Sequence, residues 1–415
     1  MAETPSKECA LTARWVFPVA GPPVERGVVT VLGEQVVAVE PHGTRAADLD
    51  LGNAAILPGL VNAHTHLDLS GMRGRCPPSP DFTGWLRQVI AHRGATPSGQ
   101  AQADVRAGIA ECLRFGTTLL GDVAFEGGSW DALAEAPLRA VVFRELLGLT
   151  REGARDALRA ALEWTPSRPE SATCRPGLSP HAPYSFRAEV LDVVCAIGRR
   201  ITIHLAESLA ELELLERQSG SFVSFLTERG VWDPSGLASS PTQVIELTRL
   251  ARSVLYAHGN YLGPDAPVPA HGTVVYCPRT HAAFGHAPHP FRDFLARGVR
   301  VALGTDGLAS NPDLDILAEA RFIHAGHPDV AGDTLLRMAT LSGAEALGWA
   351  DTTGSLAPGK SADLVVLPLP DTDAADPHRL VFESDRAVSA VMFRGRWRQR
   401  DTASGGPLEV TPRES

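Results

Sequence analysis

The sequence predicts an α/β fold, a (β/α)8 barrel of the TIM type with a small β-sandwich domain formed by both chain ends. The middle of the chain alternates apolar, β-rich runs with segments of helical period, whereas both ends contain only short strand-like runs. Histidine and aspartate residues recur where the central runs end, and the functional residues of such barrels gather at strand ends. We therefore expect a barrel domain over 57–350 and a composite β domain over 1–56 plus 351–415.

Short strands are expected near both termini. The N-terminal runs cover 14–18, 27–32 and 35–40 and are separated by Gly-Pro-Pro and Pro-His-Gly turns. The C-terminal runs cover 362–368 and 387–394, on either side of an Asp/Pro-rich connection. The polar, glycine- and proline-containing stretch from Ser404 to Ser415 is expected to fray.

The barrel strands are expected in eight apolar runs. They are 56–66, 117–123, 138–147, 174–181, 200–205, 253–258, 272–277 and 299–304. Helices with start and stop signals are expected between several of them and after the last, over 101–115, 187–197, 313–325 and 334–347.

Composition excludes several classes of partner. A formal net charge of -10 argues against nucleic acid, which usually requires a basic face. No apolar stretch approaches the roughly 20 residues that span a bilayer, so no membrane partner is expected. Six scattered cysteines without a CxxC pair, and an N-terminus without a secretory pattern, favour a reducing cytoplasm.

His64 and His66 end the first barrel run, Leu57-Pro-Gly-Leu-Val-Asn-Ala-His-Thr-His66. Residues i and i+2 of a strand point to the same side, so the two imidazoles would project together as metal ligands. Two ligands leave a tetrahedral site half filled, and His204, His258 and Asp306 are the downstream candidates. A solvated turn is the alternative for an isolated His-x-His, and the downstream series argues against it.

Glu207 follows His204 by three residues in Ile-Thr-Ile-His-Leu-Ala-Glu. A carboxylate there could take a proton from an attacking water and deliver it to the leaving group. It could also be an acidic residue at a helix N-terminus, and both roles are compatible.

The remaining strand-end residues suit supporting roles. Asp306 could serve as metal ligand and as hydrogen-bond acceptor for the attacking water, while His258 could hold water or polarise the reacting bond. His181, in Ser-Pro-His-Ala-Pro-Tyr, suits substrate contact, and a histidine satisfied within the core is the alternative.

Taken together, these motifs resemble the amidohydrolase superfamily, in the group of cytosine, guanine and S-adenosylhomocysteine deaminases and triazine hydrolases. The matching pieces span nearly the whole chain, from Pro-Gly-Leu-Val-Asn-Ala-His-Thr-His through Pro-His-Ala-Pro-Tyr, His-Leu-Ala-Glu, Ala-His-Gly, Cys-Pro-Arg and Gly-Thr-Asp to Gly354-Ser-Leu-Ala-Pro-Gly-Lys-Ser-Ala-Asp-Leu-Val. The loops are most similar to those of aminodeoxyfutalosine deaminases.

The resemblance implies a set of roles. A single divalent metal, zinc or alternatively iron, would be bound by His64, His66, His204 and Asp306, with Glu207 as proton shuttle and His258 beside the water. The fourth strand end has no lysine, unlike the two-metal subgroup. Arg73 and Trp85 lie in a stretch similar to the one that lines the ring pocket; Trp85 would stack on the ring or only cover the barrel.

Two positions depart from the group's pattern. Cys-Pro-Arg279-Thr-His281 stands where relatives often have Cys-Pro-x-Ser-Asn. Arg279 and His281 could therefore bind a carboxylate or polar substituent of the substrate, or could be loop packing. Gly307 stands where many relatives have serine, which removes one hydrogen-bond donor.

We therefore expect a hydrolytic deaminase that releases ammonia from an amino-substituted heteroaromatic ring, most plausibly an adenine-type purine or its nucleoside derivative. The partners are a small heterocyclic substrate and water, and homodimer formation is left open. One alternative is a hydrolase of another C–N or C–Cl bond. The other is a metal-free scaffold homologue, which should have lost the ligands that this chain retains.

Overall fold

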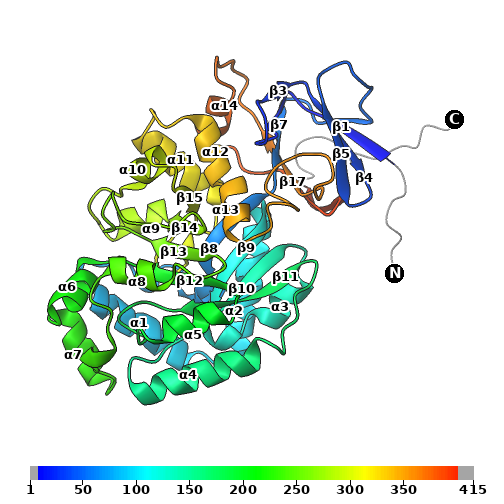
Figure 1. The fold of residues 1–415 in the computed structure, drawn as a ribbon. Helices are drawn as coiled ribbons and strands as arrows, with labels where there is room; N and C mark the ends of the chain where they lie inside the picture. Colours follow the sequence, from blue (N-terminus) through cyan, green and yellow to red (C-terminus); the bar gives the residue numbers. More distant parts are fainter. Residues whose placement is uncertain (1–7, 401–415) are drawn as a thin grey trace. The chain divides into compact units, whose positions relative to one another are not determined.

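The computed structural model describes residues 8–400, drawn in colour in Figure 1. The chain forms two compact units. One consists of the chain up to Val61, Cys112–Leu119 and the chain from Asp315 onward; the other consists of Asn62–Glu111 and Leu120–Leu314. These units do not follow the two sequence domains proposed above, whose boundaries remain a prediction. Within the described residues, no helix has both the length and the apolar character needed to cross a bilayer.

The large sheet has the strand order β15-β14-β13-β12-β11-β10-β9-β8-β16. Its strands are β8 (Leu60–His66), β9 (Thr117–Ala124), β10 (Arg139–Leu146), β11 (Cys174–Pro180), β12 (Arg200–Leu205), β13 (Val254–His258), β14 (Gly272–Tyr276), β15 (Arg300–Leu303) and β16 (Asp306–Gly307). Their burial is nearly complete, as expected for a parallel sheet covered on both faces.

The eighth barrel strand is interrupted. Its first part, β15, pairs with β14, whereas its second part, β16, pairs with β8 through Asp306↔Thr65 and Gly307↔His66. Thr305, between them, donates its backbone N–H to the His64 carbonyl over 3.1 Å. The sheet therefore closes on itself, and the predicted barrel fold is confirmed.

Helices connect most of the barrel strands, and the order of elements can be followed by colour in Figure 1. They are α1 (Phe82–Ala95), α2 (Ser98–Arg114), α3 (Trp130–Glu135), α4 (Arg151–Trp164), α5 (Val190–Ala196), α6 (Leu209–Arg217), α7 (Ser221–Glu228), α8 (Pro241–Leu247), α9 (Pro278–Ala283) and α10 (Phe291–Ala296). Short 3-10 helices cover Leu67–Met72, Phe125–Gly127 and Pro234–Gly236. No helix is assigned in the described connection from β13 to β14.

After the barrel follow α11 (Ile316–Gly326), α12 (Gly332–Met338), α13 (Leu341–Ala346) and α14 (His378–Phe382). The single helix predicted over 334–347 is in fact two helices. Thr340 separates them, because its backbone, at φ -138° and ψ -92°, is not helical.

Strands from both ends of the chain share one sheet, of order β19-β18-β17-β7-β2-β3. They are β2 (Trp15–Val16), β3 (Val24–Glu25), β7 (Ala54–Pro58), β17 (Leu364–Pro368), β18 (Ala390–Phe393) and β19 (Arg396–Arg400). A second sheet, β5-β4-β1-β6, contains β1 (Glu8–Thr12), β4 (Val28–Leu32), β5 (Gln35–Glu40) and β6 (Leu49–Asp50). The predicted strand-rich region made by both ends is confirmed, whereas the expectation for Ser404–Ser415 falls outside the described residues.

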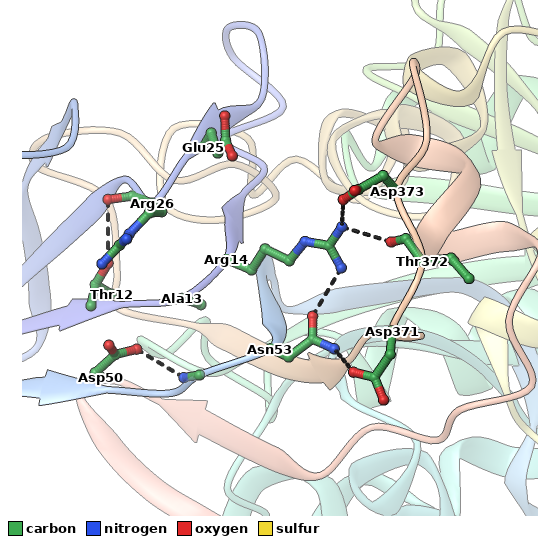
Figure 2. A pocket seen from close by; sticks show the side chains of 11 residues that line it. Thr12, Ala13, Arg14, Glu25, Arg26, Asp50, Asn53, Asp371, Thr372 and Asp373 are labelled. Atoms are coloured by element: carbon green, nitrogen blue, oxygen red, sulfur yellow. Dashed lines mark hydrogen bonds and ion pairs between the residues drawn. The ribbon is translucent and has the colours of Figure 1, made fainter.

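Side chains also join the two ends. Arg14 bonds to Asn53 over 3.1 Å and to Asp373 over 2.6 Å, and Asn53 donates to Asp371, as Figure 2 shows. These residues line a cavity of about 470 Å³. Because Arg14, Asp371 and Asp373 have partners within this network, we interpret it as structural.

Candidate active site

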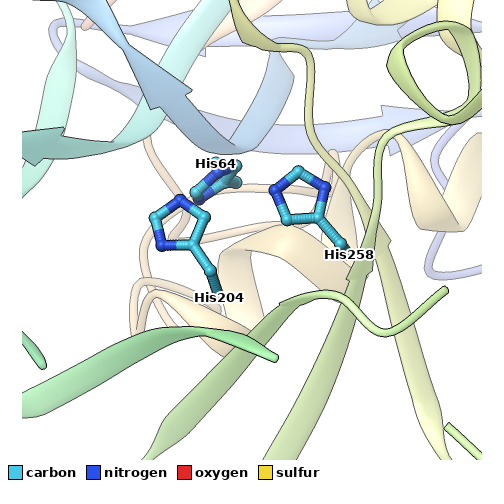
Figure 3. A group of neighbouring side chains, drawn as sticks. All are labelled: His64, His204 and His258. Carbon is cyan, nitrogen blue, oxygen red and sulfur yellow. The ribbon is translucent and has the colours of Figure 1, made fainter. Parts of the chain in front are cut away.

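The predicted metal ligands lie at the ends of neighbouring barrel strands. His64 and His66 end β8, His204 lies on β12, His258 is the last residue of β13, and Asp306 begins β16. All five side chains are buried. The strand pleat turns His64 and His66 to one side, and Figure 3 shows the rings of His64, His204 and His258 facing a common centre.

The ligand atoms have the spacing of a coordination sphere. Nε2 of His66 is 3.0 Å from Nε2 of His204, and Oδ1 of Asp306 is 3.5 Å from Nε2 of His66 and 3.6 Å from Nε2 of His64. Ligands about 2.0–2.1 Å from a tetrahedral zinc ion lie about 3.3 Å from one another. The distances therefore fit one ion held by His64, His66, His204 and Asp306.

The ring nitrogens are also in the right state. Nδ1 of His204 lies 2.9 Å from the His181 carbonyl oxygen, to which it can only donate, so Nε2 keeps its lone pair. Both ring nitrogens of His64 and Nδ1 of His66 have no hydrogen-bond partner among the described residues. Burial lowers the pKa of His66 and His204 well below the usual value, which keeps both imidazoles neutral. A buried nitrogen without a partner is costly, and a divalent cation at this centre would satisfy one nitrogen of each ring that binds it.

The backbone is strained where the functional side chains emerge. Ala206, His258 and Asp306 have φ values of 52°, 68° and 58°, in the left-handed region that residues other than glycine rarely adopt. The Glu211 carboxylate accepts the N–H groups of Ala206 and Glu207, and His289 donates to the His258 carbonyl over 2.7 Å. Such strain costs on the order of 1–3 kcal/mol per residue and clusters at functional sites.

Glu207 lies beside the predicted metal ligands. Its Oε1 is 3.5 Å from Nε2 of His258, and burial raises its pKa well above the usual range, with a further contribution from Asp306. Helix α6 begins two residues later and is capped by Ser208, while Glu211 is the acidic residue of its first turn. Glu207 therefore precedes the helix cap, and its carboxyl group is suited to hold a proton.

Asp306 is oriented by Ser310, whose hydroxyl donates to Oδ2 over 2.5 Å. At position 307, a Cβ atom would lie 3.2 Å from the Cβ of His66 and 3.3 Å from its carbonyl oxygen. Glycine therefore leaves room beside His66, and Ser310 supplies the hydroxyl contact to Asp306.

A cavity of about 510 Å³ opens onto these residues. His66, His204, Glu207, His258 and Asp306 form its polar part, and its walls are mostly apolar, including Leu69, Phe82, Trp85, Val89, Tyr184 and Phe225. Trp85 and His181 both line the cavity, as predicted for substrate contact; that role remains a prediction. The volume and lining suit a largely apolar ring with a few polar edges.

The other three predicted substrate contacts have partners elsewhere and are not among the residues that line this cavity. Arg73 pairs with Glu111 and donates to the Pro312 carbonyl. Arg279 pairs with Asp313 over 2.6 Å, and His281 bonds to the Ala287 carbonyl through Nε2 over 2.8 Å. Substrate binding by these three residues stays a prediction.

Three charged residues of the cavity were not predicted, and one of them is the exposed Arg229. Arg93, on α1, and Glu145, near the end of β10, both line it. A carboxylate at the end of the third predicted barrel strand was the available signal for Glu145. Arg93 carries no comparable signal, because its position depends on where α1 packs.

Comparisons with known proteins show relatives of similar sequence and solved structures of similar fold. A 5-methylthioadenosine/S-adenosylhomocysteine deaminase of Moorella thermoacetica is 30% identical over 390 residues, covering 88% of this chain and 85% of the relative. The structure of Helicobacter pylori aminofutalosine deaminase with methylthio-coformycin matches with a TM-score of 0.82 at 23% identity, covering 94% of this chain and 99% of that one. An adenosine deaminase of Xanthomonas campestris with bound zinc matches with a TM-score of 0.77 at 24% identity, covering 94% and 93%.

The family model described as the amidohydrolase family matches residues 55–398, which is most of the chain and includes every residue of the site above. The chain therefore belongs to the amidohydrolase family.

Proposed function

We propose that the protein is a metal-dependent hydrolytic deaminase that releases ammonia from an adenine-type purine or nucleoside derivative. The observation that carries this proposal is the buried Glu207 carboxyl group, 3.5 Å from His258, beside the cluster of histidines and Asp306 that could hold a metal ion. Both open onto one ring-sized cavity.

Each residue then has a definite task. His64, His66, His204 and Asp306 would hold the ion. When bound, a divalent metal would supply a Lewis acid beside which water loses a proton near neutral pH. Glu207, 3.5 Å from His258 and beside the proposed ligands, would accept that proton as a carboxylate and deliver it to the departing nitrogen. His258 stays neutral, because burial lowers its pKa to about 3, and its Nε2 orients the attacking water or polarises the reacting bond.

The substrate class is supported by the named relatives. The deaminases of Moorella, Helicobacter and Xanthomonas carry adenosine-type compounds in their names or in the bound ligand. The apolar walls around Trp85 and Tyr184 offer surfaces on which a purine could stack.

Three finer expectations belong to this proposal. We expect zinc to be the resident metal, as in the Xanthomonas structure, with iron as the alternative. Cytoplasmic location and homodimer formation remain predictions from the sequence.

The test is a panel of aminopurines and adenine nucleosides incubated with zinc-loaded protein, with ammonia release and metal content measured together. Adenine-type compounds should release ammonia, and Glu207→Gln protein with full metal should not. Release of chloride from chlorotriazines without ammonia from any aminopurine would favour the chlorohydrolase alternative. A protein that binds no metal would contradict the proposal.

A further inference from the structure

We propose that Glu145 determines substrate specificity by accepting a hydrogen bond from an N–H or O–H group that the substrate carries away from its reacting carbon. This inference rests on the proposed function. It adds a requirement that the metal centre does not impose: the substrate must carry a hydrogen-bond donor that reaches Glu145 in the cavity.

Glu145 has one carboxylate oxygen that accepts no hydrogen bond from residues 8–400. It is the residue before the last on β10, its side chain is 1% exposed, and it lines the cavity. Oε2 lies 3.4 Å from a guanidinium nitrogen of Arg93. Oε1 is buried and has no hydrogen-bond partner among the described residues.

Arg93 neutralises Glu145 without occupying Oε1. Its guanidinium bonds to Asp68 through Nε over 2.8 Å and through Nη2 over 3.3 Å. Burial lowers the pKa of Arg93, but the neighbouring Asp68 and Glu145 carboxylates together raise it by more than burial lowers it. Arg93 therefore stays charged. The charge of Glu145 is thus compensated from one side while its second oxygen remains available to a ligand.

The open oxygen adjoins the reaction centre. It lies 3.7 Å from Nε2 of His181, which exceeds the length of a normal hydrogen bond. The His181 ring centroid is in turn 4.6 Å from that of His204, a proposed metal ligand. A substrate bound against the metal centre would therefore place part of its ring or of its attached group next to Glu145.

The free carboxylate oxygen of Glu145, Oε1, determines which kind of substrate group can lie opposite it. A buried carboxylate oxygen is costly when unpaired, so it disfavours an acceptor or an apolar substituent opposite it. It favours a hydroxyl or amino group. The geometry points to a substrate with a sugar hydroxyl or a second amino group at this place, and to discrimination against the analogue that lacks it.

The experiment compares zinc-loaded wild-type protein with Glu145→Gln on compounds that differ by one donor. These are adenosine, 2′-deoxyadenosine, 3′-deoxyadenosine and the riboside of 2,6-diaminopurine. For wild type, loss of the relevant donor should lower kcat/KM by about 10- to 100-fold, mainly through KM. For Glu145→Gln, kcat/KM for the compound with that donor and for the compound without it should differ by less than about threefold, because the charged acceptor is gone.

Glu152→Gln is the matched control, since Glu152 is an exposed carboxylate that does not line the cavity. It should discriminate as wild type does. Glu145→Asp keeps the negative charge, but its shorter side chain draws the carboxylate back from the cavity. This variant should also lose discrimination between the paired compounds. It therefore tests the proposal even if Glu145→Gln does not fold. Metal content should remain at the wild-type level in every variant.

Equal discrimination by wild type and both Glu145 variants, with turnover intact, would overturn this inference and leave the proposed function standing. Absence of ammonia from every compound with metal-loaded wild type would instead count against the proposed function, and against this inference with it.

Discussion

The strand ends and the loop after β14 use their polar side chains in different ways. His64, His204 and His258 leave strand ends and face one another. In the loop, Arg279 and His281 on α9 bond to Asp313 and to the Ala287 carbonyl. A closed barrel fixes the direction of every strand-end side chain, whereas a loop residue takes the partner that its local turn provides. Convergence of polar groups is therefore stronger evidence of function at strand ends than in the loop.

The largest effect is expected at the strand ends. His66→Ala removes a proposed ligand that lies 3.0 Å from His204 and 3.5 Å from Asp306, so bound metal should fall well below one ion per chain and activity should disappear. Elemental analysis of the purified protein measures this directly. A fully metallated, active variant would refute the ligand assignment.

Glu207→Gln should separate chemistry from binding. Glutamine keeps the size of the side chain but cannot carry a proton, so metal content should persist while kcat falls by about 10⁴-fold, the upper end for general acid–base groups. Retention of kcat within about tenfold would place the proton shuttle elsewhere, with His258 as the next candidate.

Ser310→Ala tests the support of a ligand rather than the ligand itself. Its hydroxyl bonds to Oδ2 of Asp306 over 2.5 Å, and loss of such an outer contact typically weakens metal binding or activity by about 10- to 100-fold. Competition with a chelator gives the affinity. An unchanged affinity would show that Asp306 is held by its backbone alone.

Glu211 should make stability depend on pH. Burial raises its pKa to about 7, although the N–H groups of Glu207 and Ala206 oppose the shift. In the unfolded chain the pKa is about 4.3, so the folded state binds the extra proton and stability falls as pH rises from about 4.3 to about 7. The free energy of unfolding, measured with urea at about pH 5 and at about pH 7, should differ less in Glu211→Gln than in wild type, by up to about 3 kcal/mol. The exposed-site variant Glu152→Gln should keep the wild-type slope.

The smallest effect is expected in the loop. If Arg279 serves its ion pair with Asp313, then Arg279→Met and Asp313→Asn should lower the thermal midpoint by similar small amounts and leave kcat/KM within about threefold. A rise in KM confined to Arg279→Met would instead support the predicted substrate contact.

The sequence predicted what depends on strand periodicity. His66, His204, His258 and Asp306 lie at or near the ends of predicted runs, which implies convergence once eight parallel strands close, and that required no knowledge of distant packing. Partners such as Arg73 with Glu111 and Arg93 with Asp68 could not be predicted, because each depends on how a helix docks on the barrel. The division of the last predicted helix at Thr340 was missed because its sequence has neither proline nor glycine at that point.

The interrupted eighth strand links barrel closure to ligand binding. Besides the Thr305 N–H, this strand pairs with β8 through the two residues of β16, Asp306 and Gly307, and the first of them is a proposed ligand. An ion bound by Asp306, His64 and His66 would therefore also hold β16 against β8, where the barrel closes. By thermodynamic linkage, metal should raise the free energy of local opening there more than elsewhere in the sheet. Backbone amides of residues 304–307 should exchange with deuterium faster after chelation, while those of β10 and β11, far along the strand order, should change little.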